Sequence, residues 1–95
     1  MYIAMNKFRV IPGKESEFET VWKSRKTFLS EVPGFKEFHL LRGENGVFIS
    51  HSTWQSQGAF MEWTHSEAFA KAHAQGGSKG LIQGPPEFSG YEVVL

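Results

Sequence analysis

The sequence predicts an α+β fold with the element order β-α-β-β-α-β, the split βαβ or ferredoxin-like pattern. Two stretches with apolar residues at helical spacing alternate with four strand-like runs. An Asn-Gly pair separates the two middle runs, as expected for a β-hairpin. The 95 residues suffice for a single ferredoxin-like domain, residues 1–95, near the lower limit for a self-sufficient core.

The first half of the chain predicts a strand, a helix and a second strand. Residues 2–11 are rich in Ile, Val, Tyr and Phe and run into Pro12-Gly13, which is typical of a strand followed by a turn. In residues 14–31 the apolar side chains recur every three or four positions, which indicates a helix. Pro33-Gly34 ends that helix, and residues 35–42 form the next strand.

The second half of the chain predicts a third strand, a second helical region and a last strand. Residues 47–54 predict the third strand, joined to the second by a four-residue loop, 43–46. Ser56 is placed to cap a second helical region, which we expect to break near residues 64–66. The glycine- and proline-rich residues 76–86 predict a mobile loop, and residues 87–95 the last strand.

Both faces of the predicted sheet carry apolar residues. The first strand has them on either side, and the second is expected to place Phe35 and Leu41 opposite Phe38 and Leu40. A sheet with helices on one face and water on the other should alternate cleanly instead. We therefore expect a second copy of the chain to cover the other face, giving a homodimer.

The composition excludes several classes of function. Lys and Arg together number 10, as do Asp and Glu, so no net charge recruits nucleic acid or an anionic membrane. The absence of cysteine excludes disulfides, thiolate zinc sites, iron–sulfur clusters and thiol catalysis. Neither a signal-peptide profile nor an apolar stretch of membrane length is found. We expect a cytoplasmic protein without nucleic-acid or membrane partners.

Histidine is then the remaining candidate for a soft-metal ligand. His73, near the end of the second helical region, is either a metal or haem ligand in a cleft or a solvent-exposed histidine at a helix end. One histidine cannot hold a non-haem metal, but it can hold haem, because the porphyrin supplies four ligands. His39 and His51 are expected on opposite faces of the sheet, where they could not chelate together.

Each of three further residues has two possible roles. Trp63 is either a helix residue of the core or a wall against a flat ligand. Asn6, disfavoured within a strand, either satisfies a local backbone irregularity or offers a hydrogen-bond donor to something bound. Arg25 lies on an apolar helix stripe beside Trp22, and it either reaches the surface or pairs with a carboxylate such as a propionate.

Several motifs together resemble a known family. They are Asn6, Pro33-Gly34-Phe35, Leu40-Leu41-Arg42, Trp54-Gln55-Ser56, Ala59-Phe60, Trp63, Ala72-His73 and the terminal Tyr91-Glu92-Val93-Val94-Leu95. The chain resembles the antibiotic-biosynthesis monooxygenase superfamily over nearly its whole length. Within that superfamily it is similar to the IsdG-like haem-degrading monooxygenases. Asn6, Trp63 and His73 of this chain match the catalytic trio of those enzymes in residue type and spacing.

The resemblance implies a ferredoxin-like homodimer whose sheets close into an α/β barrel, with one active site in each subunit. Haem would be both substrate and cofactor, with His73 as the axial iron ligand. Trp63 would push the porphyrin out of plane, and Asn6 would hydrogen-bond the bound oxygen. Trp22 and Arg25 would line the pocket. Dioxygen and an external electron donor, a reductase or a small reductant, would open the ring and release iron.

Two alternatives remain from the sequence. The first is a cofactor-independent monooxygenase of quinols or polyketide-like aromatics with the same fold. The second is a dimer that binds haem without degrading it. The full set of Asn6, Trp63 and His73 favours haem chemistry over the first alternative, because the broad superfamily does not require that set.

Overall fold

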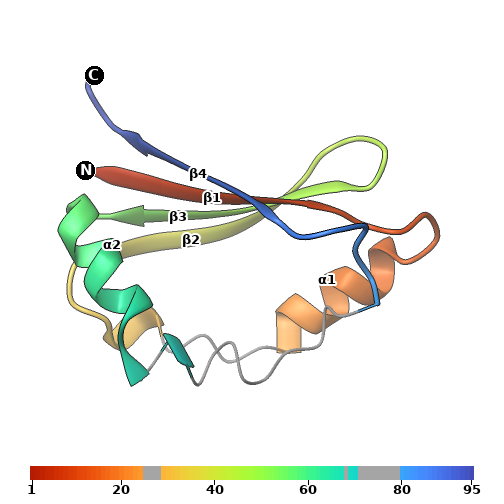
Figure 1. The fold of residues 1–95 in the computed structure, drawn as a ribbon, viewed down its shortest axis with the longest axis horizontal. Helices are drawn as coiled ribbons and strands as arrows, with labels where there is room; N and C mark the ends of the chain where they lie inside the picture. Colours follow the sequence, from red (N-terminus) through yellow and green to blue (C-terminus); the bar gives the residue numbers. More distant parts are fainter. Residues whose placement is uncertain (25–28, 68, 71–79) are drawn as a thin grey trace.

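The computed structural model describes residues 1–24, 29–67, 69–70 and 80–95. Its elements follow the predicted order, and they are β1 (Tyr2–Arg9), α1 (Glu15–Ser24), the 3-10 turn η1 (Leu29–Glu31), β2 (Phe35–Arg42), β3 (Val47–Trp54), α2 (Gln57–Thr64) and β4 (Glu87–Glu92). The strands form one antiparallel sheet in the order β2-β3-β1-β4. Helices α1 and α2 cover the same face of that sheet (Figure 1). The predicted α+β, ferredoxin-like fold is therefore confirmed.

The hairpin between β2 and β3 is confirmed, but its loop is one residue shorter than predicted. The N–H of Gly43 donates to the carbonyl oxygen of Val47 at 2.7 Å, so only residues 44–46 lie in the loop. Asn45 and Gly46 have φ values of 56° and 77°, the left-handed conformation that favours these two residue types.

The shorter loop changes which residues of the hairpin face each other. With an odd number of loop residues, His39 pairs directly with His51, and directly opposed residues of an antiparallel pair share a face. The prediction that these two histidines point to opposite faces is wrong. Their ring centroids are 6.4 Å apart, on the face of the sheet that the helices leave open.

A bulge in β2 corrects a second prediction. Phe35 pairs with Trp54, whereas Glu37 pairs with Thr53, so one residue of β2 is unmatched between them. The bulge turns the Phe35 ring to the helix-covered face, where it packs edge-on against Trp54 at 5.5 Å between centroids. The simple alternation predicted that Phe35 and Leu41 share a face. That prediction is wrong, because the bulge places them on opposite faces.

The two helical regions begin near their predicted positions. Within the predicted 14–31, α1 covers Glu15–Ser24 and the turn η1 covers Leu29–Glu31, while residues 25–28 lie outside the described residues. Ser56 caps α2, accepting a hydrogen bond from the N–H of Ala59 at 3.1 Å. The helix ends at His65, and Ser66 then accepts from the N–H of Phe69 at 3.2 Å, which confirms the predicted break.

A glycine sets how closely the start of β2 approaches α2. Gly34 has a φ of +85°, and a Cβ added there would lie 2.5 Å from the Cβ of Ala59. A larger residue would therefore both strain the backbone and push α2 away from the sheet. This close approach fixes the helix that carries Trp63.

The C-terminal part differs from the prediction in two places, the end of the predicted loop and the end of the last strand. Of the predicted loop 76–86, residues 76–79 lie outside the described residues. Leu81, however, is only 9% exposed, and Ile82 forms an isolated bridge with Val10, so this stretch is anchored to the sheet. Strand β4 ends at Glu92, three residues before the predicted end. None of the helices within the described ranges could span a bilayer.

Candidate active site

The core beneath the helices is divided into two clusters. One contains Tyr2, Ala4, Leu29, Trp54 and Phe60, and α2 packs on it. The other contains Phe8, Val10, Phe18, Phe48 and Leu81, and α1 packs on it. Between them lies the middle of β1 and β3.

Side-chain size along the two central strands explains the division. Aromatic residues face each other across the strands at both ends, with Tyr2 opposite Trp54 and Phe8 opposite Phe48. Between them stand two pairs of small or polar residues, Ala4 opposite Ser52 and Asn6 opposite Ser50. All of these even-numbered positions point toward the helices. The small pairs leave a gap that the large pairs cannot fill.

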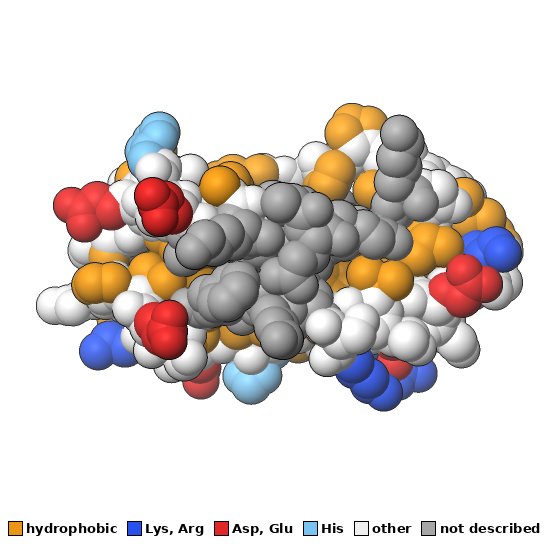
Figure 2. All heavy atoms as spheres, turned by 90° about the horizontal axis from the view of Figure 1, so that it is seen from below, with side chains coloured by type: hydrophobic (Ala, Val, Ile, Leu, Met, Phe, Trp, Pro, Cys, Tyr) orange, Lys and Arg blue, Asp and Glu red, His pale blue; other side chains and the backbone are white. Residues whose placement is uncertain are grey.

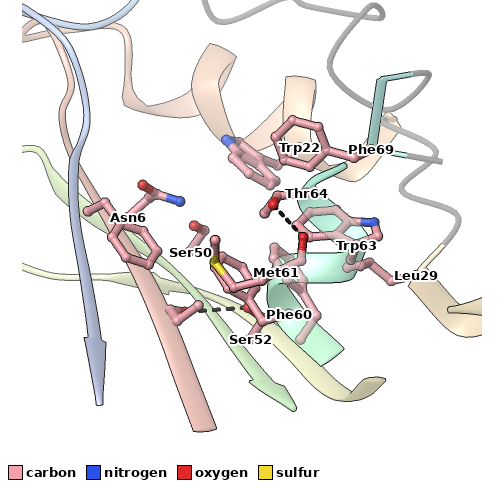
Figure 3. Close-up of a pocket in the computed structure, with 13 residues that line it drawn as sticks. Asn6, Trp22, Leu29, Ser50, Ser52, Phe60, Met61, Trp63, Thr64 and Phe69 are labelled. Carbon is pink, nitrogen blue, oxygen red and sulfur yellow. Dashed lines mark hydrogen bonds between the residues drawn. The ribbon is translucent and has the colours of Figure 1, made fainter. Parts of the chain in front are cut away.

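A cavity of about 410 Å³ occupies this gap (Figure 3). Its volume lies in the range of about 300–1,000 Å³ usual for small-molecule sites. The described lining residues are Ala4, Asn6, Trp22, Leu29, Phe38, Ser50, Ser52, Phe60, Met61, Trp63, Thr64, Phe69 and Phe88. Not one of these lining side chains carries a charge. Figure 2 looks onto the helix side of the molecule, where apolar side chains are exposed in several places among charged groups.

Flat aromatic rings form the walls of the cavity. Trp22 of α1 stacks on Phe38 with ring centroids 5.7 Å apart and planes 18° from parallel. Trp63 of α2 lies edge-on to Phe69, with centroids 4.8 Å apart, and also packs against Trp54. Rings held by such contacts form rigid apolar surfaces. A flat aromatic ligand suits a cavity of this kind.

Four of the described lining residues have a hydroxyl or amide side chain, and two of these four are engaged elsewhere. Ser52 Oγ accepts from Trp54 Nε1 at 2.9 Å, and Thr64 Oγ1 donates to the carbonyl oxygen of Met61 at 2.7 Å. The amide of Asn6 and the hydroxyl of Ser50 make no hydrogen bond to any other described residue. Among the described residues, these two groups are therefore available to form hydrogen bonds with a ligand.

The surroundings of Asn6 decide between its two alternatives. Strand β1 is paired without a break on both sides of Asn6, with Ser50 on β3 and Phe88 on β4. There is no backbone irregularity for the amide to satisfy. The amide points into the cavity instead (Figure 3). The geometry thus favours the alternative in which Asn6 meets something bound.

The structure brings three of the predicted site residues together. Asn6, Trp22 and Trp63 come from β1, α1 and α2 and line the same cavity. Trp63 is half-buried and packs against the core cluster beneath α2, so it is both a core residue and a wall. The other two predicted residues, Arg25 and His73, lie outside the described residues.

Sequence reasoning missed the small residues that create the cavity. Ser50 and Ser52 alternate between Phe48 and Trp54 on the helix-covered face of a central strand. Serines at alternate positions between two aromatic residues of one strand face are visible in the sequence, but their burial, which makes the pattern unusual, is not. Within the described ranges, no three His, Asp or Glu side chains converge to bind a metal ion.

Comparisons with known proteins agree with this geometry. The sequence profile of the family "Antibiotic biosynthesis monooxygenase" matches residues 1–75. The structure of the haem-degrader MhuD from Mycobacterium tuberculosis, with two haems bound in its active site, is 30% identical in sequence. The alignment covers 100% of this chain and 97% of that one, with a TM-score of 0.83.

A second solved structure has the same fold and a different chemistry. SnoaB from Streptomyces nogalater, a cofactor-independent oxygenase, is 22% identical over 99% of this chain and 93% of its own, with a TM-score of 0.74. At that identity the likeness concerns the fold. The match of the family profile to most of the chain, together with the fold, shows that this protein belongs to the antibiotic biosynthesis monooxygenase family.

Proposed function

We propose that this protein is a haem-degrading monooxygenase, with haem as both substrate and cofactor. The observation that carries the proposal is the convergence of Asn6, Trp22 and Trp63 on one aromatic-walled cavity. The 30% identity to MhuD, a haem-degrader with haems in its active site, supports it. Haem supplies an iron centre for dioxygen and an oxidisable ring.

The residues of the chain have distinct tasks in this proposal. The amide of Asn6 donates a hydrogen bond where negative charge develops on oxygen, a contribution that can amount to several kcal/mol. Trp63, held by Trp54 and Phe69, would be a rigid wall against the bound porphyrin, and its bending of the ring is proposed from the sequence resemblance alone. Arg25 as a partner of a propionate, and His73 as the iron ligand, are proposed from the sequence resemblance alone. The electrons come from an external reductase or small reductant.

Titration with ferric haem tests the binding step. We expect a saturable shift of the Soret band, with a spectrum characteristic of a histidine-ligated iron, and quenching of tryptophan fluorescence from Trp22 and Trp63, which line the cavity. A protein that leaves the spectrum of free haem unchanged would contradict the proposal. A shifted band with quenched fluorescence but no histidine signature would remove only the role of His73.

A cofactor-independent monooxygenase is the second candidate, and one observation favours it. The absence of charged side chains among the described lining residues suits a neutral aromatic ligand as well as a porphyrin. Such an enzyme would bind a hydroquinone or a polyketide-like aromatic and consume dioxygen without iron. Binding of a hydroquinone without any binding of haem would favour this candidate.

We also propose that the working form is a homodimer joined through the open face of the sheet. Leu41 and Tyr91 on this face are 43% and 54% exposed, and Ile3, Met5 and Ile49 are only partly buried.

A lysine at position 49 should break this dimer. Ile49 lies on central strand β3, between Lys7 and Leu41, so a lysine there would replace an apolar side chain of the interface and place a second positive charge beside Lys7. We expect Ile49→Lys to sediment as a monomer at micromolar concentration while keeping its circular dichroism. Ser16→Lys, on exposed α1, is the matched control and should remain a dimer. A wild-type protein that sediments as a monomer would refute the interface.

A further inference from the structure

We infer that Ser50 binds the ligand together with Asn6, and that the two form one hydrogen-bonding pair for a single oxygen atom of the ligand. The inference rests on the proposed function for its choice of haem as probe. It assigns a role to a residue that neither the family resemblance nor the sequence patterns pointed to.

Ser50 stands at the centre of the cavity wall. It is the direct cross-strand partner of Asn6 on β1 and of Leu40 on β2, so it lies in the interior of the sheet. Its side chain points to the helix-covered face, into the same space as the Asn6 amide (Figure 3). Both residues line the cavity.

Ser50 is mostly buried, and its hydroxyl opens onto the cavity. The residue is only 7% exposed and lines the cavity, so the remaining access to its side chain is from that space. A hydroxyl on a largely apolar wall is favourable only where it meets a hydrogen-bond partner. In the cavity that partner is water or a polar atom of a ligand.

Comparison with the neighbouring serine shows the difference. Ser52, two residues along the same strand, accepts from Trp54 Nε1 at 2.9 Å and donates to the carbonyl oxygen of Ala4 at 3.4 Å. Its hydroxyl is satisfied within the protein. Among the described residues Ser50 has no such partner, and neither does the amide of Asn6. The two residues that lack partners are thus the two that face each other.

The spacing of a cross-strand pair suits one shared oxygen atom. Directly opposed residues in an antiparallel sheet have Cβ atoms about 4.5–5.5 Å apart. A hydroxyl and an amide N–H at that separation can both reach an oxygen between them with hydrogen bonds of about 2.9 Å. The pair would hold an oxygen of the ligand from two sides, and Ser50 would fix the position that Asn6 alone leaves free.

The stretching frequency of carbon monoxide bound to ferrous haem tests this pair. Carbon monoxide places one oxygen atom at the ligand position, and hydrogen bonds to that oxygen lower its infrared frequency. We expect Ser50→Ala to bind haem with the affinity of the wild type within about twofold and to raise the frequency. Ring opening should slow by about fivefold, because the free energy of one ordinary hydrogen bond in the transition state is lost.

Two further variants separate this effect from a change of structure. Ser50→Thr keeps the hydroxyl and should restore the wild-type frequency. Ser16→Ala removes an exposed serine from α1, away from the cavity and from the open face, and should leave the frequency unchanged. If Ser50→Ala binds haem and shows the wild-type frequency and rate, the inference is wrong while the proposed function stands.

The inference also has a test that does not depend on haem. If the wild type binds no haem, the proposed function fails, and binding of a hydroquinone becomes the readout for the pair. Ser50→Ala should then bind the hydroquinone about fivefold more weakly, because one hydrogen bond to its oxygen is lost. Equal binding by the two proteins, or no binding of either probe, would overturn the role of Ser50.

Discussion

Replacement of Asn6 by alanine is expected to slow ring opening by about a hundredfold while leaving haem affinity within about twofold. The amide faces an aromatic-walled cavity, where a donor aimed at developing charge is worth far more than in water. It contributes little to binding of haem itself, because the large apolar surface provides most of that affinity. Single-turnover absorbance after addition of reductant gives the rate, and titration gives the affinity.

The matched control for this variant is Ser16→Ala. Ser16 is exposed on α1 and lies neither in the cavity nor on the open face of the sheet, so its removal deletes a polar side chain without touching either. It should turn over haem at the wild-type rate. Full activity of Asn6→Ala would remove Asn6 from the mechanism, and an equal loss in Ser16→Ala would show that the effect is not specific to the cavity.

Replacement of Trp63 by alanine is expected to affect both stability and chemistry. The indole is half-buried and contacts the rings of Trp54, Phe60 and Phe69. Losing these contacts should lower the free energy of unfolding by about 3 kcal/mol. That is less than the stability of about 5–15 kcal/mol typical of a small domain, so the variant should still fold. Ring opening should slow by at least about tenfold, since the porphyrin is no longer bent.

Trp63→Phe separates the two effects. Phenylalanine keeps most of the aromatic packing, so chemical denaturation should show most of the stability restored. Its ring is smaller than an indole and should bend the porphyrin less, so the rate should stay below that of the wild type. Resonance Raman spectra of the haem complex report the flattening directly. A flat porphyrin in the wild type, or full rates in both variants, would remove this role of Trp63.

The fold was largely predictable because it depends on local patterns. Helical spacing, turn residues and the Asn45-Gly46 pair placed the strands Phe35–Arg42 and Val47–Trp54 at their observed bounds. Details that depend on pairing between strands were not predictable. The bulge after Phe35 and the three-residue hairpin loop each shift the register by one residue, which changes the face of every side chain beyond them.

The site was predictable only in part, for a related reason. Asn6 stood out because asparagine is unusual within a strand, and Trp63 because it lies on a helix with apolar neighbours. Ser50 did not stand out, since a serine in a strand is ordinary until it is shown to be buried. Its importance comes from its register opposite Asn6, which only the paired sheet reveals.

Turnover of bound haem in air is the most direct test of the central claim that this cavity degrades haem. The protein would be loaded with one ferric haem per subunit, and ascorbate or another reductant added, with absorbance and free iron followed together. We expect the Soret band to bleach as iron is released, at a stoichiometry of about one iron per haem. A haem complex that forms but keeps its Soret band with every reductant tried, releasing no iron, would contradict it and indicate a protein that binds haem without degrading it.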